Sequence, residues 1–256
     1  MGGNFRTNFL KKLLKINSGI KLFDSIYTSN DKSKKVIESI GNKNTIVCGD
    51  LRFDADISKL SRKASDNIKK FLDKKTCLVF GSTWKEDEDI ILRYIKSSNR
   101  NIKYIIAPHE ISNNPKRIKK DLGNKSILYS DIKSNTSLQE FSCLIVDNIG
   151  MLSALYNYSS ISYVGGGMGK KGLHNTLEPA YFSKPIIIGK NYQKFEEANE
   201  MIKNGNMISI SNYNEFYNAI ESIIDNENLL IKMSKKCKEY FDKKKGAVKI
   251  ILNDLK

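Results

Sequence analysis

Short apolar runs alternate with helical patterns along most of this chain. Tyr104-Ile-Ile-Ala107 and Pro185-Ile-Ile-Ile188 are apolar at every position, which is typical of parallel strands that are buried on both faces. From residue 76 the pattern predicts strands at 76–80, 102–107, 126–129, 143–146, 161–164, 185–188 and 207–210. It predicts helices at 85–97, 115–121, 150–157 and 194–204, and further helices from the last strand to the end. We therefore predict an α/β fold with a doubly wound parallel sheet.

The first part of the chain has a different organisation. Residues 5–16 place apolar side chains on one helical stripe and lysines elsewhere, which predicts a basic amphipathic helix. Such a stripe more often packs on a core than lies on a membrane surface. A βαβ fragment is then predicted, with elements at 25–28, 31–40 and 44–48.

A polar, glycine-led segment separates the two parts. Gly49-Asp-Leu-Arg-Phe-Asp54 precedes a long amphipathic helix that is predicted from 57 to 72. We interpret this segment as an interdomain linker, which divides the chain into domains at 1–54 and 55–256.

Polar loops follow four of the predicted strands. They are Gly81-Ser-Thr-Trp84, Pro108-His-Glu110, Asp147-Asn-Ile-Gly150 and Gly165-Gly-Gly167. Each alone could be a helix cap or a strand-ending turn. Ligands of open parallel sheets bind beyond the carboxyl ends of the strands, so the coincidence of four loops predicts that they converge on one crevice.

The last of these loops is the densest glycine cluster, with glycines at 165, 166, 167 and 169. A helix is predicted to begin near Leu173 and to carry His174, Asn175 and Glu178. Glycines allow close backbone approach, and the unpaired N–H groups of a first helical turn favour an anion, so a phosphate site is expected. A glycine-rich turn can also serve a tight crossover, but a buried helix start rarely holds three such polar groups without a partner.

The net charge indicates which classes of partner the protein could bind, but it does not determine the fold. The chain has 43 Lys plus Arg against 28 Asp plus Glu, a net charge of +15. This excess favours nucleotides, anionic lipids or nucleic acid, although lysine is abundant everywhere in the chain. The four cysteines form neither a disulfide framework nor a zinc motif. No apolar run approaches the roughly 18 residues that span a bilayer, so any membrane contact is expected to be peripheral.

Taken together, these motifs resemble those of 3-deoxy-D-manno-octulosonic acid (Kdo) transferases. The resemblance spans about residues 23–205 and is carried by Gly81-Ser-Thr-Trp-Lys-Glu-Asp-Glu88, Ala107-Pro-His-Glu110, Val146-Asp147, Met151-Leu152, Leu155-Tyr156, Tyr163-Val-Gly-Gly166 and Leu173-His-Asn-Thr-Leu-Glu-Pro-Ala180. Members of that family are glycosyltransferases that move Kdo from CMP-Kdo to a lipid A precursor in lipopolysaccharide biosynthesis. The resemblance implies the GT-B fold, with 1–54 a remnant of the N-terminal acceptor domain plus linker and 55–256 the C-terminal CMP-Kdo-binding domain.

The resemblance also implies donor-binding roles. Glu178 would accept hydrogen bonds from the ribose of CMP, although a first-turn glutamate can instead satisfy the helix dipole. His109 would contact the nucleotide or the sugar carboxylate, and His174 would stabilise the loop or contact the phosphate. The phosphate, whose negative charge grows in the transition state, would be held by the N–H groups of Gly166, Gly167 and Asn175 and the hydroxyls of Ser82 and Thr83.

Other implications concern what this chain does not carry. The family's general base and membrane-associating surface lie in an N-terminal half that is absent from this sequence, so no catalytic residue is assigned. No cofactor or metal is expected, because no predicted ligand loop holds the Asp-x-Asp pair of metal-assisted transferases. The expected location is the cytoplasmic face of the bacterial inner membrane, as a peripheral protein.

Two other classes of protein compete with this interpretation. Gly167-Met-Gly-Lys-Lys-Gly172 satisfies the G-x-G-x-x-G fingerprint of NAD(P)-binding oxidoreductases, but the strand after it ends in Gly189 and Lys190, where an NAD site has an acidic residue for the ribose. A basic nucleic-acid-binding module would gather basic and aromatic residues on one surface. Here the lysines are scattered over all the predicted helices, so no nucleic-acid partner is expected.

Overall fold

The structure is a computed structural model, and it describes residues 19–56 and 66–256. The described residues form two compact units. Unit 1 contains the residues up to Ala55 together with Asp242–Lys256, and unit 2 contains Asp56–Phe241. The amphipathic helix predicted at 5–16 and the first part of the helix predicted at 57–72 lie outside the described residues.

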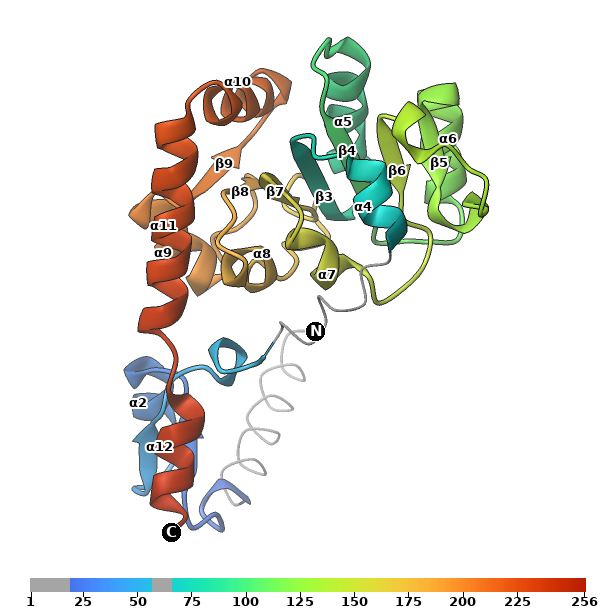
Figure 1. The fold of residues 1–256 in the computed structure, drawn as a ribbon. Coiled ribbons are helices and arrows are strands. Elements are labelled where there is room, and N and C mark those ends of the chain that lie inside the picture. The colour runs from blue at the N-terminus through green and yellow to red at the C-terminus, as the bar shows by residue number, and fades with distance from the viewer. Residues whose placement is uncertain (1–18, 57–65) are drawn as a thin grey trace, which may run out of the picture. The chain divides into compact units, whose positions relative to one another are not determined.

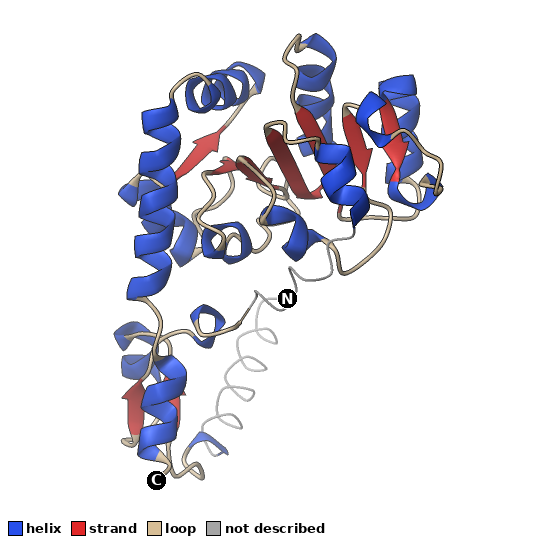
Figure 2. Ribbon diagram, in the orientation of Figure 1, coloured by secondary structure: helices blue, strands red, loops and turns tan. Residues whose placement is uncertain are grey.

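Unit 2 is built on a seven-stranded, entirely parallel sheet, which Figures 1 and 2 show with β5 at one edge and β9 at the other. The strands are β3 (Cys77–Thr83), β4 (Lys103–Pro108), β5 (Ser126–Leu128), β6 (Cys143–Ile145), β7 (Ile161–Val164), β8 (Ile186–Gly189) and β9 (Met207–Ile210). Their order in the sheet is β5-β6-β4-β3-β7-β8-β9. The predicted doubly wound α/β fold is confirmed.

Helices and short 3-10 turns connect these strands. The helices of unit 2 are α4 (Asp66–Leu72), α5 (Lys85–Ser97), α6 (Asn114–Leu122), α7 (Leu152–Tyr156), α8 (Leu177–Tyr181), α9 (Glu196–Asn204), α10 (Tyr213–Ile224) and most of α11 (Glu227–Lys243). The 3-10 turns are η2 (Gly123–Lys125), η3 (Tyr129–Asp131) and η4 (Leu138–Glu140). In the described residues no helix is both long and apolar enough to cross a membrane.

The core lies on both faces of this sheet. Leu78 and Phe80 of β3 belong to an apolar cluster that also contains residues of α5, α6 and α10. Val79, between them, points to the opposite face and is fully buried there. The sheet is therefore covered on both sides, which explains why its strands are continuous apolar runs in the sequence.

The strand order creates one topological switch point. β4, β5 and β6 lie on one side of β3, whereas β7, β8 and β9 lie on the other. The chain therefore leaves the adjacent strands β3 and β7 in opposite directions. In such sheets the ligand crevice opens beyond the carboxyl ends of these two strands.

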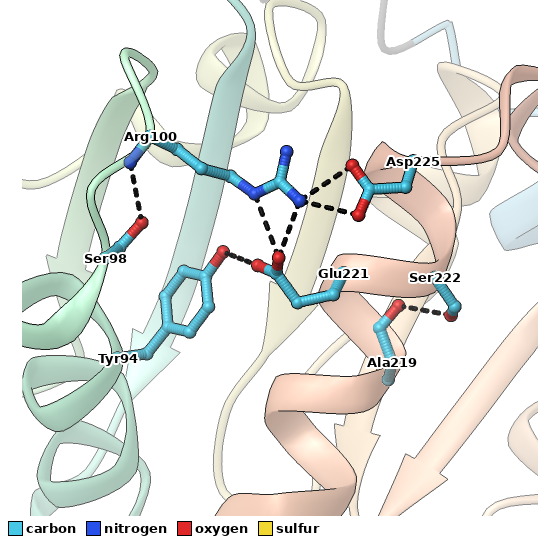
Figure 3. A network of polar contacts seen from close by, with 7 residues as sticks. All are labelled: Tyr94, Ser98, Arg100, Ala219, Glu221, Ser222 and Asp225. Carbon is cyan, nitrogen blue, oxygen red and sulfur yellow. Dashed lines mark hydrogen bonds and ion pairs between the residues drawn. The ribbon is translucent and has the colours of Figure 1, made fainter.

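A polar network ties α5 to α10 at the opposite, amino edge of the sheet (Figure 3). Arg100, in the turn before β4, donates from Nη2 to Glu221 at 2.6 Å and to Asp225 at 2.7 Å. Tyr94 donates its hydroxyl to the second oxygen of Glu221 at 2.7 Å. The hydrogen bond that Arg100 donates to Glu221 is the main reason that the pKa of Arg100 is raised above its ordinary value.

Unit 1 contains the predicted βαβ fragment. The described elements of unit 1 are β1 (Ile26–Thr28), α2 (Asp31–Ser39), β2 (Thr45–Val47), the 3-10 turn η1 (Leu51–Phe53) and α12 (Ala247–Asp254), and β1 and β2 pair in parallel. Asp54 caps α12 by accepting the N–H groups of Gly246 at 2.7 Å and Val248 at 2.9 Å. The sequence prediction put all of 55–256 in one domain, whereas residues 242–256 pack in unit 1.

Candidate functional site at the switch point

The loops that follow β3 and β7 touch at the switch point. Gly165 donates its N–H to Gly81 O at 2.9 Å. A Cβ on Gly165 would overlap the carbonyl oxygen of Ser82, so this close approach requires glycine. Ser82 itself has a φ of +52°, at an irregularity in the pairing of β3 with β4 between Gly81 and Thr83. The strand continues past this irregularity, and Thr83 pairs with Pro108 of β4.

The glycine loop then folds back on itself. His174 donates its N–H to Gly165 O at 3.1 Å, and Gly167 O accepts from Asn191 N at 2.9 Å. Gly166, with a φ of +90°, donates its N–H to Asp87 Oδ2 at 2.8 Å. In the described part of the chain, the N–H groups of Gly167, Met168 and Gly169 have no hydrogen-bond partner.

Three rings gather beside this loop. Trp84 Nε1 donates to His174 Nε2 at 2.9 Å, and the two rings are 13° from parallel. His109, after β4, lies across both rings, with centroid distances of 4.6 Å to Trp84 and 4.4 Å to His174. Lys171 Nζ is 4.7 Å from the centroid of Trp84. We call Trp84, His109 and His174 the ring cluster.

The protonation state of His174 follows from this geometry. Burial lowers its pKa from 6.5, the nearby His109 lowers it further, and Asp87 opposes both effects. An Nε2 atom that accepts the indole N–H carries no proton, so His174 is neutral and holds its proton on Nδ1.

Two buried carboxylates support these loops, and the sequence analysis gave them no role. Asp87, only 1% exposed, accepts hydrogen bonds from Trp84 N at 2.9 Å, Gly166 N at 2.8 Å and Tyr163 Oη at 2.7 Å. Glu88, fully buried, accepts from Thr83 Oγ1 at 3.1 Å and pairs with Arg117 of α6. Their position in the first turn of a helix, directly after Gly81-Ser-Thr-Trp84, was the available signal.

Glu178 and Asn175 lie together at the start of α8. Glu178 accepts from Ser153 Oγ of α7 at 2.7 Å and from Asn175 Nδ2 at 3.2 Å. Asn175 Oδ1 in turn accepts the N–H of Leu177 at 3.0 Å. Ser153 is thus a further residue of the site region that sequence reasoning missed.

Two expectations about this region are corrected. The helix predicted to begin near Leu173 begins at Leu177, because Gly172 has a φ of +100° and the segment up to Asn175 is held by its loop contacts instead. Asp147 does not join the other loops, since it accepts from Ser130 N at 3.0 Å and lies after β6, which β4 separates from β3. The loops after β3, β4 and β7 meet, and α7, which follows the Asp147 loop, reaches the same region through the bond from Ser153 to Glu178.

The predicted phosphate donors differ in availability. Gly166 N–H and Thr83 Oγ1 already have protein partners in Asp87 and Glu88. Ser82 is half-buried, and Asn175 is exposed. No group of three His, Cys, Asp or Glu side chains that could hold a metal occurs within residues 19–56 and 66–256.

Comparisons with known proteins give a consistent result in sequence and fold. No family model matches the chain. It is 33% identical over 227 residues to a bifunctional glycosyltransferase/methyltransferase of Fusobacterium nucleatum, covering 86% of this chain and 35% of that protein. It is 29% identical over 244 residues to the 3-deoxy-D-manno-octulosonic acid transferase of Rickettsia prowazekii, covering 93% of this chain and 50% of that protein. The chain thus spans about half the length of the transferases it matches.

Solved structures share the fold at low identity. The C-terminal CMP-Kdo binding domain of WaaA from Acinetobacter baumannii has a TM-score of 0.60 at 18% identity, covering 74% of this chain and 98% of that chain. UDP-GlcNAc 2-epimerase from Neisseria meningitidis, bound to UDP-GlcNAc, has a TM-score of 0.62 at 18% identity, covering 92% of this chain and 62% of that chain.

The parallel sheet and its switch point define an α/β domain of the GT-B type, the class of the glycosyltransferases and epimerases that share this fold. Within that class the sequence is specific. The chain is a homologue of the Kdo transferases, and the resemblance found in its motifs is confirmed.

Proposed function

We propose that unit 2 binds CMP-Kdo in the crevice beyond β3 and β7, as the donor-binding part of an enzyme that transfers Kdo to a lipid A precursor in lipopolysaccharide biosynthesis. The observation that carries this function is the meeting of the loops after β3, β4 and β7 at the switch point of a Kdo transferase homologue. Ligands of this sheet class bind at that position.

The phosphate of the donor is assigned to the glycine loop. The N–H groups of Gly167, Met168 and Gly169 have no partner in the described residues, and Ser82, half-buried and with a left-handed φ, lies at the neighbouring end of β3. Backbone N–H groups that are fixed before the reaction stabilise charge that develops on a leaving phosphate. Gly166 and Thr83 support this loop through the two buried carboxylates instead of binding the phosphate.

The remaining site residues are assigned to the nucleoside and the sugar. Glu178, held by Ser153 and Asn175, accepts hydrogen bonds from the ribose hydroxyls, because a carboxylate has free lone pairs beyond these two bonds. The ring cluster offers stacking surface, and His109, its exposed member, contacts the nucleotide or the sugar carboxylate.

Unit 1 is assigned to the acceptor side of the enzyme. The homologous transferases are about twice as long as this chain, and a two-stranded parallel sheet such as β1–β2 is too small to be stable alone. The catalytic base and the contact with the cytoplasmic face of the inner membrane then lie in the part that the homologues have in addition. Transfer is expected to need no metal, which addition of EDTA to the assay tests.

The structural context argues against an NAD site. The segment Gly167–Gly172 leads into a loop that runs to Thr176, whereas the dinucleotide fingerprint opens directly into a helix. Tight, steeply salt-dependent binding of single-stranded nucleic acid would be the observation in favour of the basic binding module.

Calorimetric titration tests the donor site. CMP is expected to bind and NAD is not, and Glu178→Gln is expected to weaken CMP binding about tenfold, the equivalent of one charge-assisted hydrogen bond. Glu239→Gln, an exposed position on α11, is the matched control and leaves the affinity unchanged. Binding of NAD in preference to CMP would overturn the function, and unchanged affinity in Glu178→Gln would remove only the ribose role.

A further inference from the structure

The glycine loop is held by backbone hydrogen bonds, by Asn191 and by a buried carboxylate that belongs to another segment. Asp87 lies in the first turn of α5, yet its carboxylate reaches Gly166 N, Trp84 N and Tyr163 Oη at 2.7 to 2.9 Å. These groups come from the loop after β3, from β7 and from the glycine loop. One buried side chain thus joins both strands of the switch point.

Only a carboxylate satisfies all three donors. Asp87 Oδ2 accepts two N–H groups and Oδ1 accepts the tyrosine hydroxyl, and at 1% exposure no bulk water replaces a lost bond. A buried N–H without a partner costs about 1–3 kcal/mol. Replacement of the carboxylate therefore changes the position of the loop or leaves a donor unsatisfied.

The first turn of α5 is itself unfavourable for an anion. The first turn of α5 contains Glu86, Asp87 and Glu88, so negative charges already lie at the positive end of that helix dipole. An anion that enters the crevice meets its free N–H donors in the glycine loop, on the residues that directly follow Gly166. The direction of these donors depends on how Gly166 is fixed.

We propose that Asp87 is a positioning residue: by holding the Gly166 N–H, it orients the next N–H groups of the glycine loop toward the donor phosphate. The identity of the ligand, a donor phosphate, rests on the proposed function. The bond between Asp87 and Gly166 N–H does not depend on it. Displacements of about 1 Å in such a site can cost about a hundredfold. Asp87 therefore contributes to phosphate binding without contacting the phosphate.

The first test needs no variant. In amide hydrogen exchange followed by NMR, the Gly166 N–H is expected to exchange at least about tenfold more slowly than the Gly167 N–H, because both residues are buried and only the first is bonded. Equal exchange at the two positions would overturn the role of Asp87, whatever the protein binds.

The second test separates positioning from general destabilisation. Asp87→Ala, which removes the acceptor of the Gly166 N–H, is expected to weaken CMP binding about 10- to 100-fold and to change cytidine binding less than about threefold, because cytidine lacks the phosphate. Asp89→Ala, on the exposed side of the same helix, leaves both affinities unchanged. An equal loss for CMP and cytidine would mean a structural role only and would overturn the proposal.

The outcomes distinguish this role from the proposed function. If the unaltered protein binds neither CMP nor cytidine, the donor-site function fails, and the exchange rates of Gly166 and Gly167 still decide the positioning role. If Asp87→Ala does not fold, the exchange measurement on the unaltered protein again gives the answer.

Discussion

The polar groups at the two edges of the sheet are used in opposite ways. At the amino edge, Arg100 binds Glu221 and Asp225, so each charge is satisfied by another side chain. At the carboxyl edge, Asp87 binds backbone N–H groups, and the N–H groups next to them have no partner in the described residues. Both clusters join segments far apart in sequence, but only the second leaves donors for a ligand. A polar cluster indicates a site when its bonding is incomplete, not when it is dense.

The largest effect on stability and CMP binding is expected at Gly165, where the loops after β3 and β7 are in closest contact. Gly165→Ala places a methyl group against the Ser82 carbonyl, and such overpacking is expected to lower the free energy of unfolding by about 3 kcal/mol and to weaken CMP binding as the loops separate. Chemical denaturation and CMP titration measure the two effects. Gly19→Ala, where a Cβ meets nothing within 4 Å, is the control. A stable Gly165→Ala protein with unchanged CMP affinity would contradict the close contact of these loops.

A smaller effect is expected from the amino edge. Arg100→Ala leaves Glu221 and Asp225 without their shared cation, and the expected loss in the free energy of unfolding is about 1–2 kcal/mol. CMP affinity is expected to stay within about threefold, because this edge contributes nothing to the crevice. Arg100→Lys should recover part of the stability, since it restores the charge without the planar fork. A loss of CMP binding in Arg100→Ala would erase the distinction between the two edges.

The smallest effect is a pH dependence of the ring cluster. The pKa of His174 is lower in the folded protein than its ordinary value of 6.5, so the unfolded state binds more protons below pH 6.5. Stability is therefore fully present above that pH and falls as the pH drops below it, by at most about 1.4 kcal/mol per pH unit. Protonation also removes the bond from Trp84, the single tryptophan, so its fluorescence should change over the same range. His174→Gln should abolish both changes, and their persistence would assign them to another group.

Much of the architecture was predictable from the sequence, for a physical reason. Strands buried on both faces are apolar throughout, so β4 and β8 can be recognised as buried strands from their apolar runs in the sequence. α5 was predicted within its observed limits because its acidic first turn and its periodic apolar residues agree. The placement of Trp84, His109 and Glu178 near the carboxyl edge followed from the same reasoning.

The rest depends on contacts that a single sequence does not contain. The start of α8 was misplaced because the conformation of Gly172 to Asn175 is decided by bonds to Gly165 and Trp84, not by local propensity. Asp147 was expected in the crevice because strand order, which puts β4 between β6 and β3, cannot be read from strand patterns. The bond from Gly166 to Asp87 joins residues 79 positions apart, and no pattern in the sequence around either residue predicts it.

The capping of α12 by Asp54 has a consequence for biosynthesis. Residues 242–256 leave the ribosome after the whole of unit 2 has been made, yet unit 1 needs them. The β1–β2 fragment therefore lacks its partner α12 while about 190 further residues are translated. Unit 2, which is continuous in sequence, can fold in the meantime, so during synthesis unit 2 is complete before unit 1.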